Sequence, residues 1–326
     1  MRKITKILAL SSLFLAFAGV TLDAEEPEKY PSRPVTLTGA FAAGGSTDLT
    51  CRAIGSVAPK YFSQPIISVP KPGGAGLVAL QNLASSKADG YTYHLGRPSE
   101  MSIAPFIEKM PFDMAKDFIP VGQVAQDRIV FSVYAKSPWN TIEDLIAAAR
   151  KEPDKIKFAC SSTTATTRLG LEKFCHEAGI KLACVPFKGG TPAAIAVAGG
   201  HVPVLTSTVS EALPHSQRGD MRVLLVCADQ RVKEYPDVPT AKEKGFDVNF
   251  GIWCTVFARK DTPPAILAKF EELLKKAAED KEFVDAMTKL GSEPGFVSAA
   301  EFAAYWPKER KWIGEIVRGV GLSKSP

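Results

Sequence analysis

Short apolar runs alternate along the chain with segments in which apolar residues recur every three or four positions. Runs such as 35–41 (VTLTGAF), 156–162 (IKFACSS) and 202–208 (VPVLTST) predict strands. Segments such as 48–62 and 167–179 predict amphipathic helices. Because strands that alternate with helices build parallel sheets covered by helices, the pattern predicts an α/β fold.

The end of the chain has a different pattern. Residues 263–319 are mostly amphipathic helix, and Pro307 predicts a break in it because proline lacks the backbone N–H that a helix needs. Thr141 and Ser298 are each followed three residues later by an acidic residue, which is the signature of a capping box. We therefore expect helices to begin directly after these two positions.

The first 24 residues have the pattern of a secretory signal peptide. Arg2, Lys3 and Lys6 form a basic start, 7–20 is apolar, and the small residue Ala24 offers a cleavage point. The apolar run is too short for a stable membrane anchor. The sequence thus predicts export to the periplasm and a mature chain of about 300 residues, enough for two domains.

Charge and cysteine content narrow the class of partner. A formal net charge of +5 is too small to favour nucleic acid or a membrane surface. The six cysteines include no CxxC pair, and the histidines have no zinc-binding spacing, so no metal or cofactor is predicted. Six cysteines allow 15 pairings. Cys175 with Cys184 is the favoured bridge, whereas the alternative is that most cysteines are small core residues.

Two loops carry the candidate chemistry, and each joins the carboxyl end of a strand to the start of a helix. Ligands of open α/β sheets bind at such junctions, where free backbone N–H groups and the helix dipole attract anions. The loops contain small and hydroxyl residues, which add donors with little bulk. The candidate residues are Ala42, Ala43, Gly44, Gly45, Ser46, Thr47 and Asp48 in the first loop, and Ser161, Ser162, Thr163, Thr164, Thr166 and Thr167 in the second.

Alternatives remain open for these loops. Ser46, Thr47 and Asp48 are also what an ordinary helix start prefers, so capping alone would explain one loop. Nucleotide binding is not favoured, because the glycines do not form GxGxxG and no Walker lysine follows them. Enzyme activity is not predicted either, because the chain has no GxSxG elbow and its four histidines are scattered.

Several ordered segments resemble a known family. They include YPSRPVTLTGAFAAGGSTDLTCRAI (30–54), VPKPGGAGLVALQNLASSKADGYTY (69–93), MPFDMAKDFIPVGQVA (110–125) and VPFKGGTPAAIAVAGGHV (185–202). The chain resembles, over essentially its whole mature length, the substrate-binding proteins of tripartite tricarboxylate transporters, the Bug or TctC-like family.

The resemblance implies a two-lobed periplasmic binding protein of type II-like fold, with two Rossmann-like lobes and a ligand cleft between them. Lobe 1 would comprise 25–125 and 252–326, and lobe 2 would comprise 126–251. The two loops would hold one carboxylate of a small organic anion. The implied partners are that carboxylate and the membrane permease subunits of a tripartite carrier, and the protein would be a monomer.

Further site residues follow from positions where the chain departs from the family pattern. Arg97 and Ser99 lie in a third loop, where Arg97 would bind a second carboxylate or form an ion pair with Glu100. Ser207 and Thr208 stand where many members carry an aspartate, which disfavours a ligand with an ammonium group.

Trp253 lies near the return crossover between the lobes. It would stack on a ligand ring or pack in the core.

These features together predict a periplasmic binding protein for a small carboxylate, with dicarboxylates or aromatic carboxylates favoured. One alternative is a ligand sensor that presents its closed shape to a membrane kinase. A less favoured alternative is an enzyme on the same fold.

Overall fold

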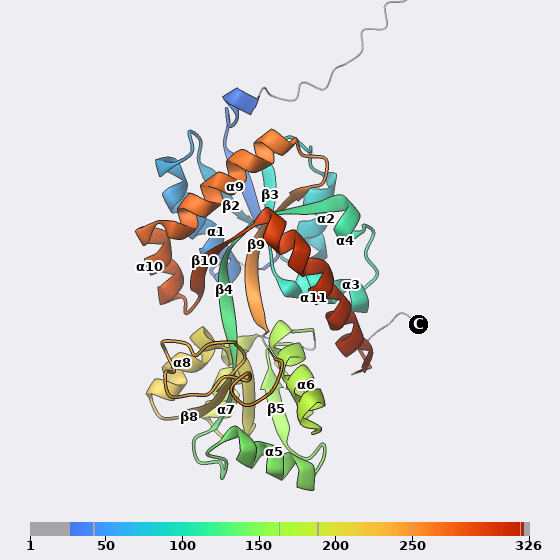
Figure 1. Cartoon of the computed structure of the whole chain (residues 1–326), viewed down its shortest axis with the longest axis vertical. Coiled ribbons are helices and arrows are strands. Elements are labelled where there is room, and N and C mark those ends of the chain that lie inside the picture. The colour runs from blue at the N-terminus through green and yellow to red at the C-terminus, as the bar shows by residue number, and fades with distance from the viewer. Residues whose placement is uncertain are drawn as a thin grey trace, which may run out of the picture.

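The computed structural model describes residues 27–41, 43–162, 164–187, 189–248, 250–319 and 321–322. The predicted signal peptide, Ala42 and Thr163 lie outside the described residues. Figure 1 shows an elongated molecule with two bodies, and strands β4 and β9 run between them. The predicted α/β fold with two lobes is confirmed.

Each lobe contains a strand–helix–strand–helix–strand unit with the same strand order. Hydrogen bonding joins the strands of the described chain in the order β2-β1-β3-β9-β4-β7-β5-β6. The central strand of each unit is therefore the one that comes first in the sequence. The lobe 1 unit comprises β1 (Val35–Gly39), α1 (Ser46–Val57), β2 (Ile66–Pro70), α2 (Leu77–Ser85) and β3 (Thr92–Gly96). The lobe 2 unit comprises β5 (Lys157–Cys160), α6 (Thr166–Ala178), β6 (Ala183–Pro186), α7 (Gly190–Ala198) and β7 (Val204–Thr208).

Strand directions show that the two units face each other. The long strand β4 (Phe118–Tyr134) pairs with β9 (Gly251–Arg259) and β10 (Glu293–Ser298) in its first part and with β7 and β8 (Met221–Val226) in its second part. Strand β3 is antiparallel to β9, and β9 is antiparallel to β4, so the lobe 1 unit runs with β4 towards lobe 2. Strand β7 is antiparallel to β4, so the lobe 2 unit runs towards lobe 1. The carboxyl ends of both units therefore point into the region between the lobes.

Helices cover the sheets and complete two main cores. One core lies in lobe 1 and includes Leu37, Ile54 and Phe270, and the other includes Phe131 and Phe174 of lobe 2. The remaining helices are α3 (Ala104–Ile107), α4 (Met114–Asp117), α5 (Ile142–Lys151), α8 (Val209–Gln217), α9 (Pro264–Glu279), α10 (Lys281–Lys289) and α11 (Ala299–Gly319), with a one-turn π-helix, η4 (Ser99–Ile103).

Helix α11 joins the two lobes. It begins beside lobe 1 and runs diagonally towards lobe 2 (Figure 1). Ile313 and Val317 near its end belong to the same core cluster as Phe174, and the Trp312 ring lies 4.8 Å from that of Phe250. The C-terminal segment thus packs on lobe 2, although its first half packs on lobe 1 through Phe302 and Trp306.

Three sequence expectations for local structure have clear outcomes. The capping boxes after Thr141 and Ser298 are confirmed by reciprocal hydrogen bonds. The predicted break at Pro307 is wrong, because α11 continues through it. Phe302, Trp306 and Ile313 are buried along this helix, and their burial holds it together despite the lost backbone hydrogen bond. The tail also contains β10, which the helical pattern of 263–319 did not predict.

The predicted Cys175–Cys184 bridge is also wrong. All six cysteines are free, and Cys175 is buried on α6. The Cys184 sulfur instead lies 3.2 Å from that of Cys160 on the neighbouring strand. The prediction failed because the pairing of β5 with β6 sets Cys184 opposite Phe158, two residues before Cys160 on the same face of the sheet, while Cys175 lies on α6.

No helix of the described chain is long and apolar enough to cross a membrane.

Candidate ligand-binding site

The first loop leaves the start of α1 open. Gly44 has a φ of +79°, which other residues rarely adopt, and Gly45 precedes the helix in an extended conformation. Among the described residues no side chain caps this helix, and residues 43–46 are exposed. The first N–H groups of a helix have no intrahelical acceptor. The N–H groups of Ser46 and Thr47 are therefore available to a ligand.

The buried side chain of Asp48 stabilises this loop through hydrogen bonds. Its carboxylate accepts hydrogen bonds from the backbone N–H of Gly44 (2.9 Å), from Ser68 Oγ (2.7 Å) and from Arg52 Nε (2.9 Å). Burial of the carboxylate favours a higher pKa, but these donors together outweigh it and hold the pKa of Asp48 below its ordinary value. Asp48 thus fixes the loop conformation, and its oxygens are already used within the protein.

The second loop has the same design. Ala165 precedes α6 in an extended conformation, and no side chain within the described part of the loop caps the helix, which begins at Thr166. Ser161, Ser162 and Thr164 are half-buried before it. The Thr167 hydroxyl is buried and has no hydrogen-bond partner among the described residues. This loop therefore offers hydroxyl groups and free N–H groups towards lobe 1.

Helices α2 and α7 also start between the lobes, and a buried glutamate lies beside each start. Glu211 lies so close to Gly190, the first residue of α7, that a Cβ atom there would overlap the carboxylate. Since a carboxylate is favoured at a helix N-terminus, the start of α7 is satisfied internally. Beside Gly76, the residue before α2, lie the Cβ and Cγ atoms of Glu100, whose carboxylate accepts from the third loop. The first turn of α1 contains Asp48, whose oxygens are already used, and the first turn of α6 contains no acidic residue.

Arg97 lies at the end of β3 and is buried, with 4% of its surface exposed. Its Nη1 donates to Asp127 Oδ2 at 2.6 Å, and Ser292 Oγ donates to the other carboxylate oxygen. The Nε and Nη2 groups of Arg97 are buried without a partner within the described part of the chain. Such buried donors cost free energy unless something accepts from them, so the guanidinium has spare capacity for an anion.

The expected ion pair between Arg97 and Glu100 takes a different form. The backbone N–H of Arg97 donates to Glu100 Oε1 at 2.7 Å, and Ser99 Oγ donates to Oε2 at 2.6 Å. The guanidinium pairs with Asp127 instead. The hydroxyl of Ser99 thus donates its hydrogen to Glu100 within the third loop, so it can contact a ligand only as an acceptor or after breaking this bond.

Two other candidates, Ser207 and Thr208, lie at the end of β7. Ser207 is 1% exposed, and its Oγ donates to the carbonyl of Thr208. Thr208 forms a capping box with Glu211 and bonds to Ser210 Oγ at 2.9 Å. Their hydroxyls are therefore engaged in building the start of α8.

Trp253 lies in the core. It is 1% exposed, its ring centroid lies 4.9 Å from that of Phe302, and its Nε1 donates to Glu309 at 2.8 Å. Of the two alternatives, the structure thus favours core packing, and Trp253 is not part of the site proposed below.

Sequence reasoning missed Asp127 and Glu211, which organise the region between the lobes. Asp127 is the only acidic residue of strand β4, which is mostly buried, and a single acid in such a strand is a usable signal. Glu211 lies in the first turn of α8, where an acid is ordinarily interpreted as a capping residue. Its burial raises its pKa, and the charge of Asp127 adds to this effect.

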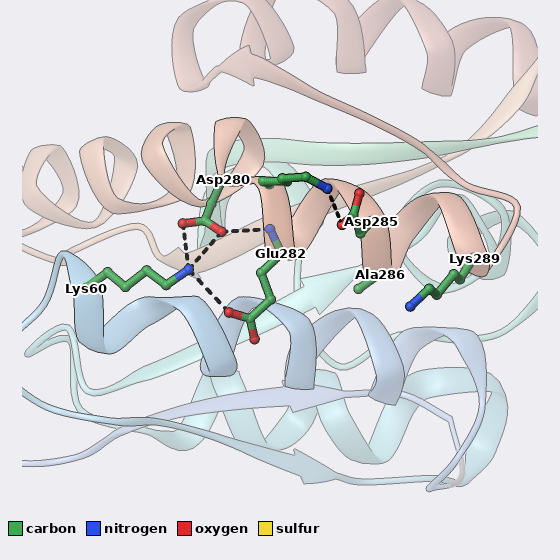
Figure 2. A pocket seen from close by; sticks show the side chains of 7 residues that line it. Lys60, Asp280, Glu282, Asp285, Ala286 and Lys289 are labelled. Atoms are coloured by element: carbon green, nitrogen blue, oxygen red, sulfur yellow. Dashed lines mark hydrogen bonds and ion pairs between the residues drawn. The ribbon is translucent and has the colours of Figure 1, made fainter.

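One surface hollow, of about 580 Å³, is lined by Lys60 and by residues of α10 and by no residue of either loop (Figure 2). Lys60 bonds to Asp280 at 3.0 Å and contacts Glu282 at 3.2 Å, and Lys281 contacts Asp285 at 2.7 Å. The Lys60 pairs therefore link α10 to the short helix that follows α1. No group of three or more potential metal ligands occurs among the described residues.

Two similar lobes joined by β4 and β9, with open helix starts facing each other, define the periplasmic solute-binding class of protein. The family model of the tripartite tricarboxylate transporter family receptor, TctC, matches residues 50–322. The chain belongs to this family, whose members are solute-binding receptors. The resemblance stated from the sequence is confirmed.

Relatives of known sequence align with nearly the whole chain. BugT of Bordetella pertussis is 28% identical over 97% of this chain and 98% of its own length. A protein of the UPF0065 group from Bordetella bronchiseptica is 30% identical over 94% of this chain and 90% of its own length.

Solved structures of periplasmic binding proteins have a similar fold over most of the chain. A TctC solute-binding protein from Polaromonas has a TM-score of 0.80 and 28% identity, covering 89% of this chain and 99% of that one. An R. palustris protein solved with adipate has a TM-score of 0.78 and 27% identity, covering 90% and 99%. MatC from Rhodopseudomonas palustris, solved with malate, has a TM-score of 0.74 and 25% identity, covering 88% and 100%.

Proposed function

We propose that the protein is exported to the periplasm, captures a small organic dicarboxylate between its lobes and delivers it to the membrane subunits of a tripartite carrier. One observation carries this proposal. Helices α1 and α6, which follow β1 and β5, start between the lobes without a side-chain cap from the described residues, and the oxygens of Asp48 in the first turn of α1 already accept from Gly44, Ser68 and Arg52. The starts of α1 and α6 are left for an anion supplied by a ligand.

The first ligand carboxylate would accept from the N–H groups of Ser46 and Thr47 and from those of Thr166 and Thr167. Hydroxyls of the second loop would add further donors, since Ser161, Ser162 and Thr164 remain partly exposed. Hydrogen bonds to a charged group contribute about 1.5–3 kcal/mol each. Three or four such bonds, reduced by the cost of ordering the ligand and both loops, support micromolar affinity.

The second ligand carboxylate would accept from Nε and Nη2 of Arg97. Both atoms lack a partner among the described residues, and Asp127 orients the guanidinium by its bond to Nη1. Arginine is suited to this task because its planar group presents two parallel donors to a carboxylate. Adipate and malate, the ligands of two structural neighbours, are both dicarboxylates.

Closure would move the lobes about the strands that connect them. We propose that lobe 1 comprises 25–125 and 252–326 and lobe 2 comprises 126–251, so that the chain crosses within β4 and again at the start of β9. Because a ligand that touches both lobes favours the closed arrangement, binding produces a shape that the membrane subunits can recognise.

A thermal-shift panel on the mature protein tests the proposal. We expect adipate, malate or another short dicarboxylate to raise the unfolding temperature. A ligand present at 100 times its dissociation constant stabilises by about 2.7 kcal/mol. The monocarboxylate hexanoate, matched to adipate in length, should give a smaller shift. Absence of any shift over a broad set of dicarboxylates would contradict the proposal.

The substitution Ser46→Pro tests the first carboxylate contact. Ser46 is the first residue of α1, a position where proline is tolerated because its N–H has no intrahelical acceptor. Gly45 is extended, as the residue before a proline must be. We expect the fold to be retained and the ligand affinity to fall about 10-fold or more, which corresponds to roughly 1.4 kcal/mol.

The matched control is Ser46→Ala, which removes the hydroxyl but keeps the N–H. Isothermal titration with the best ligand of the panel should show a larger loss for Ser46→Pro than for Ser46→Ala. Equal affinities for Ser46→Pro and the unaltered protein would remove this N–H from the site.

A further inference from the structure

Cys160 and Cys184 lie side by side beneath the second loop. Cys160 is the last residue of β5, directly before Ser161, and Cys184 lies on the adjacent strand β6. Their sulfur atoms are 3.2 Å apart, and Cys160 Sγ also contacts the carbonyl oxygen of Ser162 at 3.2 Å. We propose that this pair is a redox-active dithiol that closes to a disulfide in the periplasm and fixes the base of the second loop.

The two sulfurs have different surroundings. Cys160 is fully buried, whereas Cys184 is partly exposed and lines a hollow of about 450 Å³ together with Arg168 and His176. Cys184 is therefore the sulfur that a reagent from solvent can reach. Cys160 lies behind it, in the position of a resolving thiol.

The pKa shifts of the two thiols agree with Cys184 as the attacking thiol and Cys160 as the resolving thiol. The hydrogen bond from Cys160 lowers the pKa of Cys184, and the positive charge of Arg168 adds to the effect. The same contact, together with burial, raises the pKa of Cys160. Since the thiolate is the reactive form, Cys184 attacks first. A partly exposed thiol of lowered pKa beside a second cysteine is the arrangement of reversible redox sites.

The reaction needs an oxidant, which we take to be a disulfide-containing compound or protein of the oxidising compartment. The Cys184 thiolate attacks one sulfur of that disulfide, forms a mixed disulfide and releases the other sulfur as a thiolate. The Cys160 thiol then loses its proton and attacks Cys184 Sγ, which expels the second sulfur. The receptor loses two protons and two electrons, and the oxidant is reduced to two thiols.

The cross-link would close a segment that contains the whole second loop and α6. It would thereby restrict β6 against β5 and limit how far the loop moves when the lobes open. The chemistry of the pair does not depend on a ligand, so its failure and the failure of the proposed transport function are distinguishable.

Thiol counting on the mature full chain tests the proposal. We expect protein incubated with oxidised glutathione to show four thiols after denaturation in alkylating reagent, because two of the six cysteines are consumed. Peptide mapping without reductant should link the peptides of Cys160 and Cys184. The oxidised form should unfold roughly 5 °C above the reduced form. Six free thiols, or a link to a different cysteine, would overturn the proposal.

Single variants provide the controls. Cys184→Ser should leave five free thiols and unfold at the same temperature with and without oxidant. Cys160→Ser should stop at the mixed disulfide of Cys184 with glutathione, leaving four free thiols and no link between the two peptides. Cys175→Ser changes a buried cysteine on α6 and should keep the link, leaving three free thiols. If Cys175→Ser abolishes the thermal difference while Cys184→Ser retains it, the assignment is refuted.

Discussion

Replacing Arg97 by Met should lower the free energy of unfolding by about 3–5 kcal/mol, since it leaves the buried carboxylate of Asp127 without its cation. Arg97 and Asp127 are 4% exposed each, and their side chains meet at 2.6 Å. Because Met fills a similar volume, the decrease in the free energy of unfolding reports mainly the broken ion pair and only to a small extent a cavity. Urea unfolding of the ligand-free protein at neutral pH gives the value.

Two further variants separate the ion pair from other effects. Asp127→Asn combined with Arg97→Met should recover most of the lost stability, because no buried charge is then unmatched. Arg218→Met removes an exposed arginine that bonds to Asp220 and should cost no more than about 1 kcal/mol. A full loss in the double variant would show that packing, rather than charge pairing, explains the effect.

The double variant also tests the second carboxylate contact. It should fold but bind dicarboxylates about 100-fold more weakly, as expected from the loss of two charge-assisted hydrogen bonds. Its affinity for a matched monocarboxylate should change little. If both ligands weaken equally in titration calorimetry, Arg97 supports the site without touching the second carboxylate.

The sequence predicted those features that local pattern determines. Alternating apolar runs located the strands, and the two loops of small and hydroxyl residues at the ends of β1 and β5 follow directly from the α/β alternation. Helix starts at Thr141 and Ser298 were recognised because a capping box is a contact between neighbours in the chain. The orientation of the loops towards each other required the strand directions given by β4.

Contacts between distant residues could not be predicted in this way. For Arg97 the sequence left open a second ligand carboxylate or an ion pair with Glu100, whereas its guanidinium pairs with Asp127 across the sheet. Cys184 was matched with Cys175, although β6 places its sulfur near that of Cys160. Pro307 was interpreted as a break because the buried face of α11 was unknown. The cysteine pairing replaced a tertiary contact with a near neighbour in the sequence.

A buried carboxylate outside the site gives the second large effect. Glu309 on α11 is fully buried and accepts hydrogen bonds from Trp253 Nε1 (2.8 Å), Ser102 Oγ (2.7 Å) and Tyr305 OH (3.2 Å). Burial raises the pKa of Glu309 to about 7, although these donors and the charge of Arg310 oppose the shift. The protonated form is therefore favoured in the folded state relative to the unfolded chain.

This shift predicts a loss of stability with rising pH. Because the folded-state pKa lies above the unfolded value of 4.5, the contribution of Glu309 is fully present below pH 4.5 and is lost as the pH rises through about 7. The expected decrease in the free energy of unfolding is up to about 3 kcal/mol, at about 1.36 kcal/mol per unit of pKa. Urea unfolding at pH 5 and pH 8 measures it.

Glu309→Gln isolates this contribution from other titrating groups, such as Glu211 and His215, whose pKa values are also shifted. The amide keeps the shape, still accepts from Trp253 and does not titrate, so the stability of the variant relative to the unaltered protein should rise between pH 5 and pH 8. Glu315→Gln, on an exposed position of the same helix, should follow the unaltered protein at both values. Parallel pH profiles for Glu309→Gln and the unaltered protein would contradict the assignment, because a carboxyl group whose pKa differs between the folded and unfolded states makes the stability difference between the two proteins change with pH.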